Sequence, residues 1–156
     1  RAMVELAVAD DQRFAVSSVE LDRYGPSYTS ETLRLLRAEW GAERRMCLIL
    51  GWDMLTYLPH WHEPESVIAT VDQIAAAHRP GVPEPAGELE RLRQALPGLA
   101  EKLVILPAPE LDVAATDLRE RVASNLPIRY LVPDAVRAYV EAHHLYRTGP
   151  APAEVE

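Results

Sequence analysis

Short apolar runs alternate with amphipathic stretches along most of the chain. In the amphipathic stretches apolar residues recur every three or four positions, which predicts helices, whereas unbroken apolar runs of four or five residues predict buried strands. Proline, glycine and small polar residues mark the boundaries between them. This pattern predicts strands at residues 13–21, 46–50, 74–78 and 102–106, and helices at residues 30–40, 54–58, 65–71, 88–96, 116–123 and 134–144, with residues 1–9 already in helical period.

The most strongly predicted strand is the apolar run from Met46 to Leu50, which ends at Gly51. Such a run is typical of a central strand in a parallel sheet that is covered on both faces. Because strands and helices alternate throughout, we predict an α/β fold with a mostly parallel sheet and helices on both faces. Cys47 lies inside the run and should be buried, which argues against its use as a nucleophile.

Two polar residues stand where helix N-caps are expected. We predict Ser30 as the N-cap of the helix that runs to about Trp40, and Thr116 as the N-cap of the helix that runs to Ala123. In the first of these helices the spacing of Leu33, Leu36 and Trp40 places all three on the inward face. We expect Trp40 to belong to the core or to an interface rather than to a site.

Composition and length predict a single soluble α/β domain over residues 1–146. The chain has 156 residues, of which 48% are hydrophobic and 26% charged, and it has no apolar stretch long enough to span a membrane. Its single cysteine excludes a disulfide within the chain, so a cytoplasmic location is the default. The proline-containing tail, residues 147–156, is expected to be disordered.

The net charge of −8 restricts the partners that this chain can bind. General binding to nucleic acid needs a basic face to neutralise phosphates, so we expect no nucleic-acid partner. A single nucleotide is not excluded, because one or two arginines and a helix N-terminus act locally, whereas more distant charges are screened beyond about 8–10 Å.

The segment that follows the apolar run is a candidate ligand site. Ligands of parallel sheets bind at the carboxyl ends of the strands, where Gly51 and Asp53 stand. A glycine there lets the backbone approach a ligand closely, and an aspartate can accept hydrogen bonds from ribose hydroxyls. On spacing alone, Asp53 as a mere cap for the helix at residues 54–58 is an equal alternative.

Other strand-to-helix junctions carry side chains suited to a nucleotide. Parallel strands bring all these junctions to one edge of the sheet, so we expect Tyr28, Asp53, Trp61, Arg79 and Arg119 around one crevice. Aromatic side chains stack on flat rings, and arginines bind phosphates. The set therefore predicts a site for a flat ring attached to phosphate.

In order and spacing, these segments resemble the bacterial nicotinate mononucleotide adenylyltransferase family of the nucleotidyltransferase superfamily. The resemblance extends from Arg1 to Tyr146. It rests on four motifs in sequence order, which are Pro26-Ser27-Tyr28-Thr29 with Thr32-Leu33, Gly51-x-Asp53 with Trp61, Arg79-Pro80-Gly81, and Asp117-Leu118-Arg119 followed by Ile128-Arg129-Tyr130-Leu131-Val132-Pro133 and Leu145-Tyr146. The family has a Rossmann-like fold and joins nicotinate mononucleotide to the adenylyl group of ATP, releasing pyrophosphate. The resemblance implies the same fold and reaction here, in NAD biosynthesis.

The resemblance also implies where the nicotinate ring binds. Tyr28 and Thr29 match the loop that lies against the ring, the threonine contributing backbone contacts. Trp61 matches the tryptophan that stacks on the ring. His62 matches the next residue, whose backbone amide can meet the carboxylate on the pyridine.

The remaining matches concern ribose and phosphates. Gly51 and Asp53 match the strand end that holds ribose, and Arg79 stands where the family usually has a basic residue near the dinucleotide. Thr116 and Arg119 match the helix-start motif that grips the ATP phosphates through N–H groups and a bidentate guanidinium. The implied cofactor is Mg²⁺, bound with ATP.

The chain departs from the family pattern at two places. Ala114 and Ala115 replace serines of the phosphate motif. The glycine-rich strand and turn with His-x-Gly-His, which supply the family's catalytic histidines, are absent from this sequence, so the first strand and part of the first helix of the fold are expected to be missing. His60-Trp61-His62 is no substitute because it lacks the glycine. We therefore expect no catalytic residue in this chain and little or no activity from it alone.

Two alternatives to this interpretation remain open, and a third is disfavoured. The first is a non-catalytic nucleotide-binding remnant, and the second is a sister nucleotidyltransferase such as a phosphopantetheine adenylyltransferase. The third, a metal site formed by His60, His62, Glu63 and Glu65, is disfavoured because these residues lie on an irregular segment around prolines. A homo-oligomer is compatible with the sequence.

Overall fold

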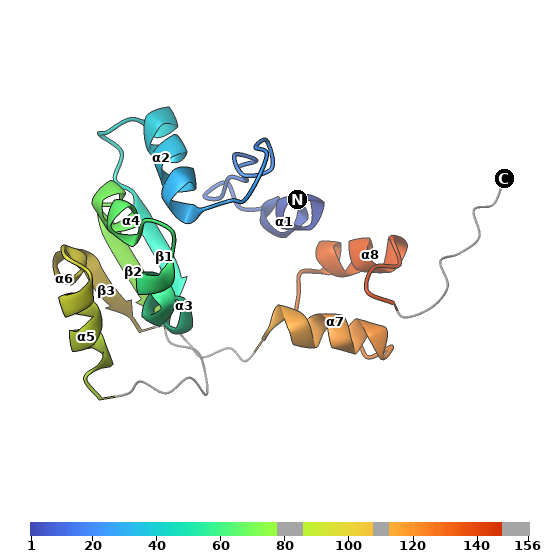
Figure 1. The fold of residues 1–156 in the computed structure, drawn as a ribbon. Coiled ribbons are helices and arrows are strands. Elements are labelled where there is room, and N and C mark those ends of the chain that lie inside the picture. Colours follow the sequence, from blue (N-terminus) through green and yellow to red (C-terminus); the bar gives the residue numbers. More distant parts are fainter. Residues whose placement is uncertain (78–85, 108–112, 148–156) are drawn as a thin grey trace. The chain divides into compact units, whose positions relative to one another are not determined.

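A computed structural model describes residues 1–77, 86–107 and 113–147 of the chain. The fold divides into two compact units (Figure 1). The sheet unit comprises residues Ser18–Asp112, and the terminal unit comprises Arg1–Ser17 together with Val113–Glu156.

The sheet unit contains three parallel strands in the order β1-β2-β3. β1 (Cys47–Gly51) pairs with β2 (Gln73–Ala77), which pairs with β3 (Leu103–Leu106). The register places Leu50 opposite Ala76, and Ala76 opposite Ile105. The predicted α/β class with a parallel sheet is confirmed, and three of the four predicted strands are present within about one residue of their predicted bounds.

Helices flank this sheet. They are α2 (Thr29–Trp40), α3 (Trp52–Tyr57), the 3-10 turn η1 (Leu58–His60), α4 (Pro64–Thr70), α5 (Glu88–Ala95) and α6 (Leu99–Lys102). Pro64 occupies the first position of α4, where its missing N–H is not needed. The apolar positions of these helices and of β2 form one core, in which Leu55, Leu58, Val67, Ile74 and Leu99 are completely buried.

An arginine fastens the carboxyl ends of α2 and α4 together. The Arg37 guanidinium donates to the carbonyl of Thr70 at 2.9 Å and to the Asp72 carboxylate at 2.7 Å. Asp72 also accepts a hydrogen bond from the backbone N–H of Met46, at 2.7 Å. This N–H and the Arg37 guanidinium hold the pKa of Asp72 below its usual value. The start of β1 is thereby tied to the segment that enters β2.

A lysine caps the carboxyl end of α4. Lys102 Nζ donates to the carbonyls of Ile68 and Val71, at 2.7 and 2.8 Å. The last carbonyls of a helix lack partners within it, so a cation there satisfies them and interacts well with the helix dipole. Lys102 is the last residue of α6 and directly precedes β3. Its hydrogen bond to Ile68 therefore connects α4 to the end of α6, across 34 residues of the chain.

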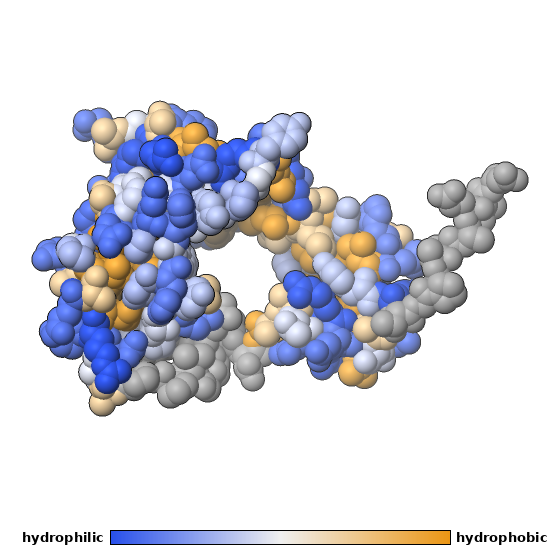
Figure 2. Space-filling view, viewed as in Figure 1, coloured by the Kyte–Doolittle hydropathy of each residue, from blue (hydrophilic) through white to orange (hydrophobic). Residues whose placement is uncertain are grey.

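The terminal unit is helical. It consists of α1 (Ala2–Val8), α7 (Ala115–Ala123) and α8 (Asp134–Ala142), and α1 packs against α8. Val140 of α8 and Ile128 of the α7–α8 connection are its buried apolar residues. Among the described residues of both units, no helix is long and apolar enough to cross a membrane. Hydrophilic residues occupy most of the visible face of each unit (Figure 2).

Several predictions about individual elements were wrong. Residues 13–21 form turns and irregular backbone rather than a strand. Ser30 is the second residue of α2 and is buried, while Tyr28 is the N-cap, and likewise Thr116 lies inside α7, whose N-cap is Ala114. Trp40, expected on the inward face, is 41% exposed at the end of α2.

The burial of β1 also differs from the prediction. β1 is an edge strand of the described sheet, so its outer edge is not paired there. Ile49 is 70% exposed, and Cys47 is exposed as well. The apolar run correctly predicted a strand. Such a run does not show, however, how many faces and edges of that strand are covered by the rest of the described chain.

Candidate functional site

Asp53 lies at the carboxyl end of β1, in the first turn of α3. Gly51 is the N-cap of this helix, with φ −71° and ψ 155°, and no side chain caps it. One carboxylate oxygen of Asp53, Oδ1, is shielded from solvent and has no hydrogen-bond partner among the described residues. The equal alternative from the sequence, a capping role, therefore has no support in the geometry. A shielded carboxylate oxygen without a donor is costly unless a ligand satisfies it.

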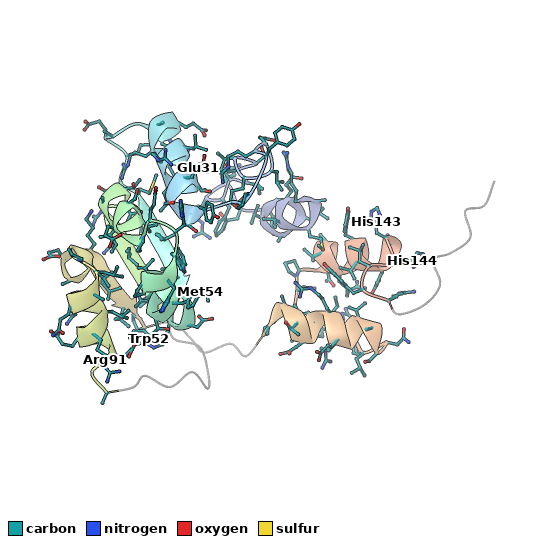
Figure 3. The ribbon with its side chains drawn as sticks, in the orientation of Figure 1. Glu31, Trp52, Met54, Arg91, His143 and His144 are labelled. Carbon is teal, nitrogen blue, oxygen red and sulfur yellow. The ribbon has the colours of Figure 1, made fainter. Side chains whose placement is uncertain are left out.

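The neighbours of Asp53 on α3 face different surroundings (Figure 3). Trp52 is 1% exposed and belongs to the core, whereas Met54 is 42% exposed. The buried tryptophan anchors the start of α3 against the sheet, so the position of Asp53 is fixed by packing. The core position of Trp52, directly after Gly51, was not predicted from the sequence.

Trp61 ends the 3-10 turn η1 and packs against the core with part of its ring. It remains only partly buried, so some of its ring is open to a ligand. Two residues later Glu63 has φ 51° and ψ 59°, a left-handed conformation that is uncommon outside glycine. Residues in this conformation persist where surrounding contacts fix them. The backbone at Glu63 thus constrains the position of His62, which lies between Trp61 and Glu63.

Tyr28 and His62 are brought together although 34 residues separate them. Their ring centroids are 4.1 Å apart, with the planes tilted by 30°. Tyr28 is the N-cap of α2, and Thr29 is the first residue of that helix. The structure therefore places Tyr28 against His62. The shared crevice, and the contact of Tyr28, Thr29, Trp61 and His62 with a substrate, stay predictions.

A second ring pair lies close by in sequence. His60 stacks on Tyr57, with centroids 4.9 Å apart and planes within 15°. His62 Nε2 is 3.9 Å from Glu63 Oε1. No group of three or more histidines, cysteines or acidic residues could hold a metal ion within the part of the chain that the structure describes. Arg79 lies outside that part.

The phosphate motif belongs to the terminal unit. Thr116 and Arg119 are three positions apart on α7, so both lie on one helix face. The Arg119 guanidinium lies over the ring of Tyr146, 5.8 Å from its centroid. Ala114 is the N-cap and Ala115 the first residue of α7, so the two serine replacements sit directly at the helix start.

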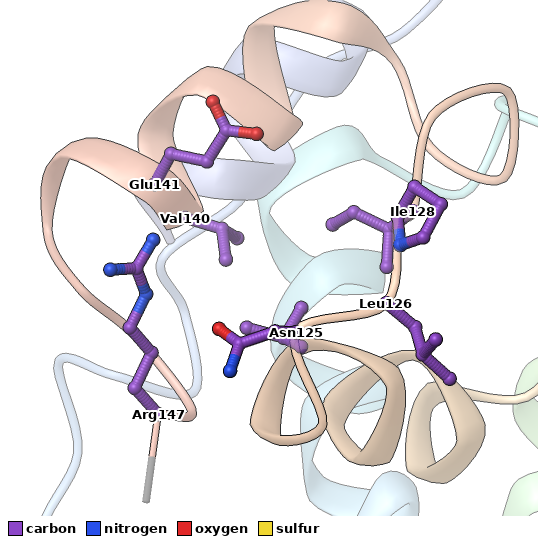
Figure 4. Close-up of a pocket in the computed structure, with 8 residues that line it drawn as sticks. Asn125, Leu126, Ile128, Val140, Glu141 and Arg147 are labelled. Atoms are coloured by element: carbon purple, nitrogen blue, oxygen red, sulfur yellow. The ribbon is translucent and has the colours of Figure 1, made fainter. Parts of the chain in front are cut away.

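Two of the hollows in the described part of the terminal unit border α7 and α8. One, of about 230 Å³, is lined by residues of α7, α8 and their connection, including Asn125 and Glu141, and by Arg147, which follows α8 (Figure 4). The other, of about 250 Å³, is mostly apolar and has Arg119 and Tyr146 in its lining. The second hollow thus shares its arginine with the predicted phosphate motif.

Comparison with known proteins identifies relatives across nearly the whole chain. No protein-family model matches it. A "Probable nicotinate-nucleotide adenylyltransferase" of Roseiflexus sp. (strain RS-1) is 49% identical over 146 residues, which span 94% of this chain and 70% of the relative. Proteins of the same name from Pseudomonas putida (strain W619) and Dehalococcoides mccartyi (strain CBDB1) are 41% and 38% identical, over 94% and 92% of this chain and 70% and 69% of their own. The chain belongs to the nicotinate-nucleotide adenylyltransferase family.

Proposed function

We propose that this chain binds nicotinate mononucleotide and ATP for adenylyl transfer, which yields nicotinate adenine dinucleotide and pyrophosphate. Asp53 carries the proposal, because its Oδ1 is shielded and lacks a donor among the described residues, at the strand end where nucleotides bind. Ribose hydroxyls are donors that would satisfy this oxygen. The family membership supplies the identity of the substrates.

The nicotinate ring is assigned to the partly open Trp61. A flat ring stacked on an aromatic side chain gains about 1–3 kcal/mol in single-stranded nucleic-acid sites, and a pyridine should gain a similar amount. The amide N–H groups of Thr29 and His62 are assigned to the ring carboxylate. Thr29 begins a helix of 12 residues, whose first N–H groups have no partner inside the helix and carry partial positive charge.

The ATP phosphates are assigned to Thr116 and Arg119, with Arg79 near the dinucleotide. To bind phosphate, the Arg119 guanidinium would either move away from Tyr146 or bind from its position above the Tyr146 ring. Ala114 and Ala115 provide no hydroxyl groups, so backbone N–H groups at the start of α7 must take over those contacts. Each hydroxyl contact to a charged phosphate that is not replaced would cost about 1.5–3 kcal/mol.

Magnesium would arrive as part of the ATP complex. Mg²⁺ keeps several waters and binds substrate phosphates with one or two carboxylates, so it needs no cage of protein ligands. Among the described residues, Asp53 offers one carboxylate oxygen without a donor, which could accept from a ribose hydroxyl or serve as such a ligand to the metal ion. Bound in this way, the metal ion would neutralise charge on the phosphates.

The reaction itself needs no protein nucleophile. The phosphate of nicotinate mononucleotide attacks the α-phosphorus of ATP in line, and pyrophosphate leaves. Holding the two substrates in this geometry can supply roughly 7–11 kcal/mol of the barrier. The assigned residues bind and orient the two substrates, so we expect this chain to bind both.

Calorimetric titration of the chain with each substrate tests the assignment. Trp61→Ala should weaken nicotinate mononucleotide binding by about 5–150-fold, the equivalent of the stacking energy, and leave ATP binding unchanged. Trp40→Ala is the matched control, because Trp40 is an exposed tryptophan at the far end of α2. Equal losses for both substrates would contradict the ring assignment.

Release of pyrophosphate from the two substrates separates an enzyme from a binding remnant. Turnover at a rate normal for the family would show that the chain needs no further segment. Turnover that appears only when the upstream coding region is expressed with the chain would assign the missing catalytic groups to that region. Binding without turnover in both forms would favour the remnant.

A further inference from the structure

The ring contact between Tyr28 and His62 fixes an imidazole beside the start of α2. The 4.1 Å separation between the ring centroids leaves no room for another group between them. Tyr28 is the N-cap of α2, so the histidine reaches the end of the helix at which unpaired N–H groups are found. The left-handed conformation of Glu63, and Pro64 at the first position of α4, fix the backbone directly after His62.

The nitrogen atoms of this imidazole remain available. Its ion-pair partner among the described residues is the Glu63 carboxylate, and 3.9 Å between Nε2 and Oε1 is too long for a hydrogen bond. The His62 side chain is 50% exposed, so a ligand can reach it. The tilted contact with the Tyr28 ring restricts the orientation of the imidazole.

The other charges at the start of α2 already have partners. Glu31, in its first turn, pairs with Arg23 at 2.7 Å, and Thr32 Oγ1 donates to Glu20 at 2.7 Å. Glu31 therefore does not add an uncompensated negative charge beside the imidazole. An anion between Thr29 and His62 would meet backbone N–H groups on one side and an imidazole N–H on the other.

We propose that the imidazole of His62 determines specificity, favouring nicotinate mononucleotide over nicotinamide mononucleotide. This inference rests on the proposed function and concerns the side chain of His62, whereas the ring assignment above uses only its backbone. A carboxylate can accept hydrogen bonds at both oxygens, and a charged acceptor makes a bond about twice as strong as a neutral one. A carboxamide offers one acceptor and presents an NH₂ group where the second would be.

His62→Phe isolates the donor, because phenylalanine retains a ring to stack on Tyr28 and has no N–H group. The measurement is the ratio of the dissociation constants for the two mononucleotides, determined by calorimetric titration of the whole chain. We expect His62→Phe to reduce the preference for nicotinate mononucleotide about tenfold, through weaker binding of that ligand alone. A ratio equal to that of the unchanged chain would overturn the proposal.

His60→Phe is the matched control. His60 is also stacked on a tyrosine, Tyr57, and stands only two residues away, so the same substitution should leave the ratio unchanged. A similar loss of preference in both variants would also count against a specific role for His62. His62→Gln retains an N–H donor and should keep more of the preference than His62→Phe; the opposite order would contradict the proposed hydrogen bond.

Trp61→Ala separates this inference from the function on which it rests. Stacking does not distinguish the ring substituents, so that variant should weaken both mononucleotides about equally. If neither mononucleotide binds the unchanged chain, the proposed function itself fails. If both bind and Trp61→Ala weakens both, while His62→Phe leaves their ratio unchanged, the function stands and the specificity role fails.

Discussion

Replacing Asp53 by alanine should stabilise the free protein and weaken its binding of nucleotide. The carboxylate oxygen Oδ1 is shielded from solvent and has no donor among the described residues. The alanine substitution removes this unsatisfied hydrogen-bond acceptor from the ligand-free chain. The same removal takes away the acceptor that ribose hydroxyls would use, so stability and affinity should change in opposite directions.

The expected magnitudes follow from the position of Asp53. An unsatisfied buried polar group costs about 1–3 kcal/mol, whereas an acidic residue in the first turn of a helix contributes only about 0.3–1 kcal/mol through the dipole. The cost of the unsatisfied oxygen is larger than the dipole contribution. The free energy of unfolding should therefore rise by about 1 kcal/mol, and the melting temperature by roughly 2–4 °C. Loss of one hydrogen bond to a charged group should weaken binding by about 10–150-fold.

Thermal unfolding by circular dichroism, and calorimetric titration with nicotinate mononucleotide and ATP, measure the two effects. Glu65→Ala is the control, because Glu65 is an exposed acidic residue in the first turn of α4 and loses only the dipole contribution. It should lower the melting temperature slightly and leave binding unchanged. A lower melting temperature for Asp53→Ala, together with unchanged affinity for both substrates, would show that Asp53 is a structural residue.

Three further predictions concern the scaffold. The pKa of Asp72 is lowered, so its contribution to stability is present above the usual carboxyl pKa and is lost as the pH falls through its own; Asp72→Asn should flatten the acid side of a plot of unfolding free energy against pH. Lys102→Met removes a charged donor from the carbonyls that end α4 and should lower the free energy of unfolding in urea by about 1.5–3 kcal/mol. Ile49→Lys places a charge on the open edge strand, so it should reduce self-association in light scattering with little change in melting temperature, because Ile49 is 70% exposed.

The parallel sheet was predictable because its signal is local. The run from Met46 to Leu50 and the later runs around Ile74 and Val104 are short, apolar and bounded by helix patterns, and these features alone indicate parallel strands. The place of Asp53 at the end of β1 followed from the same argument. Element type and order therefore came from periodicity, with no knowledge of packing.

Burial was less predictable, because it depends on which elements cover a position. Cys47 and Ile49 have the sequence character of a central strand, yet the described sheet places them on an edge strand. Trp40 has helical spacing with Leu33, but it is the last residue of α2 and is exposed. At residues 13–21 the β-branched content suggested a strand, and no partner strand pairs with them among the described residues.

Helix starts failed for a more local reason. Ser30 and Thr116 have the right side chains for capping, but each helix begins one residue earlier than predicted, so each residue lies inside its helix. Boundaries assigned from sequence commonly shift by this amount. At Ser30 the shift has a consequence, because the hydroxyl group is buried and has no partner among the described residues.

The candidate ring site depends on contacts at both ends of one helix pair. α2 packs against α4, and the two carboxyl ends are joined by the hydrogen bond from Arg37 to the carbonyl of Thr70. At the opposite ends, Tyr28 precedes α2 and His62 precedes α4, and their rings are in contact. A helix pair held at both ends has little freedom to slide or splay. The distance between the backbone groups of Thr29 and His62 is therefore set by the scaffold before any ligand arrives, so binding need not supply the energy to bring them together.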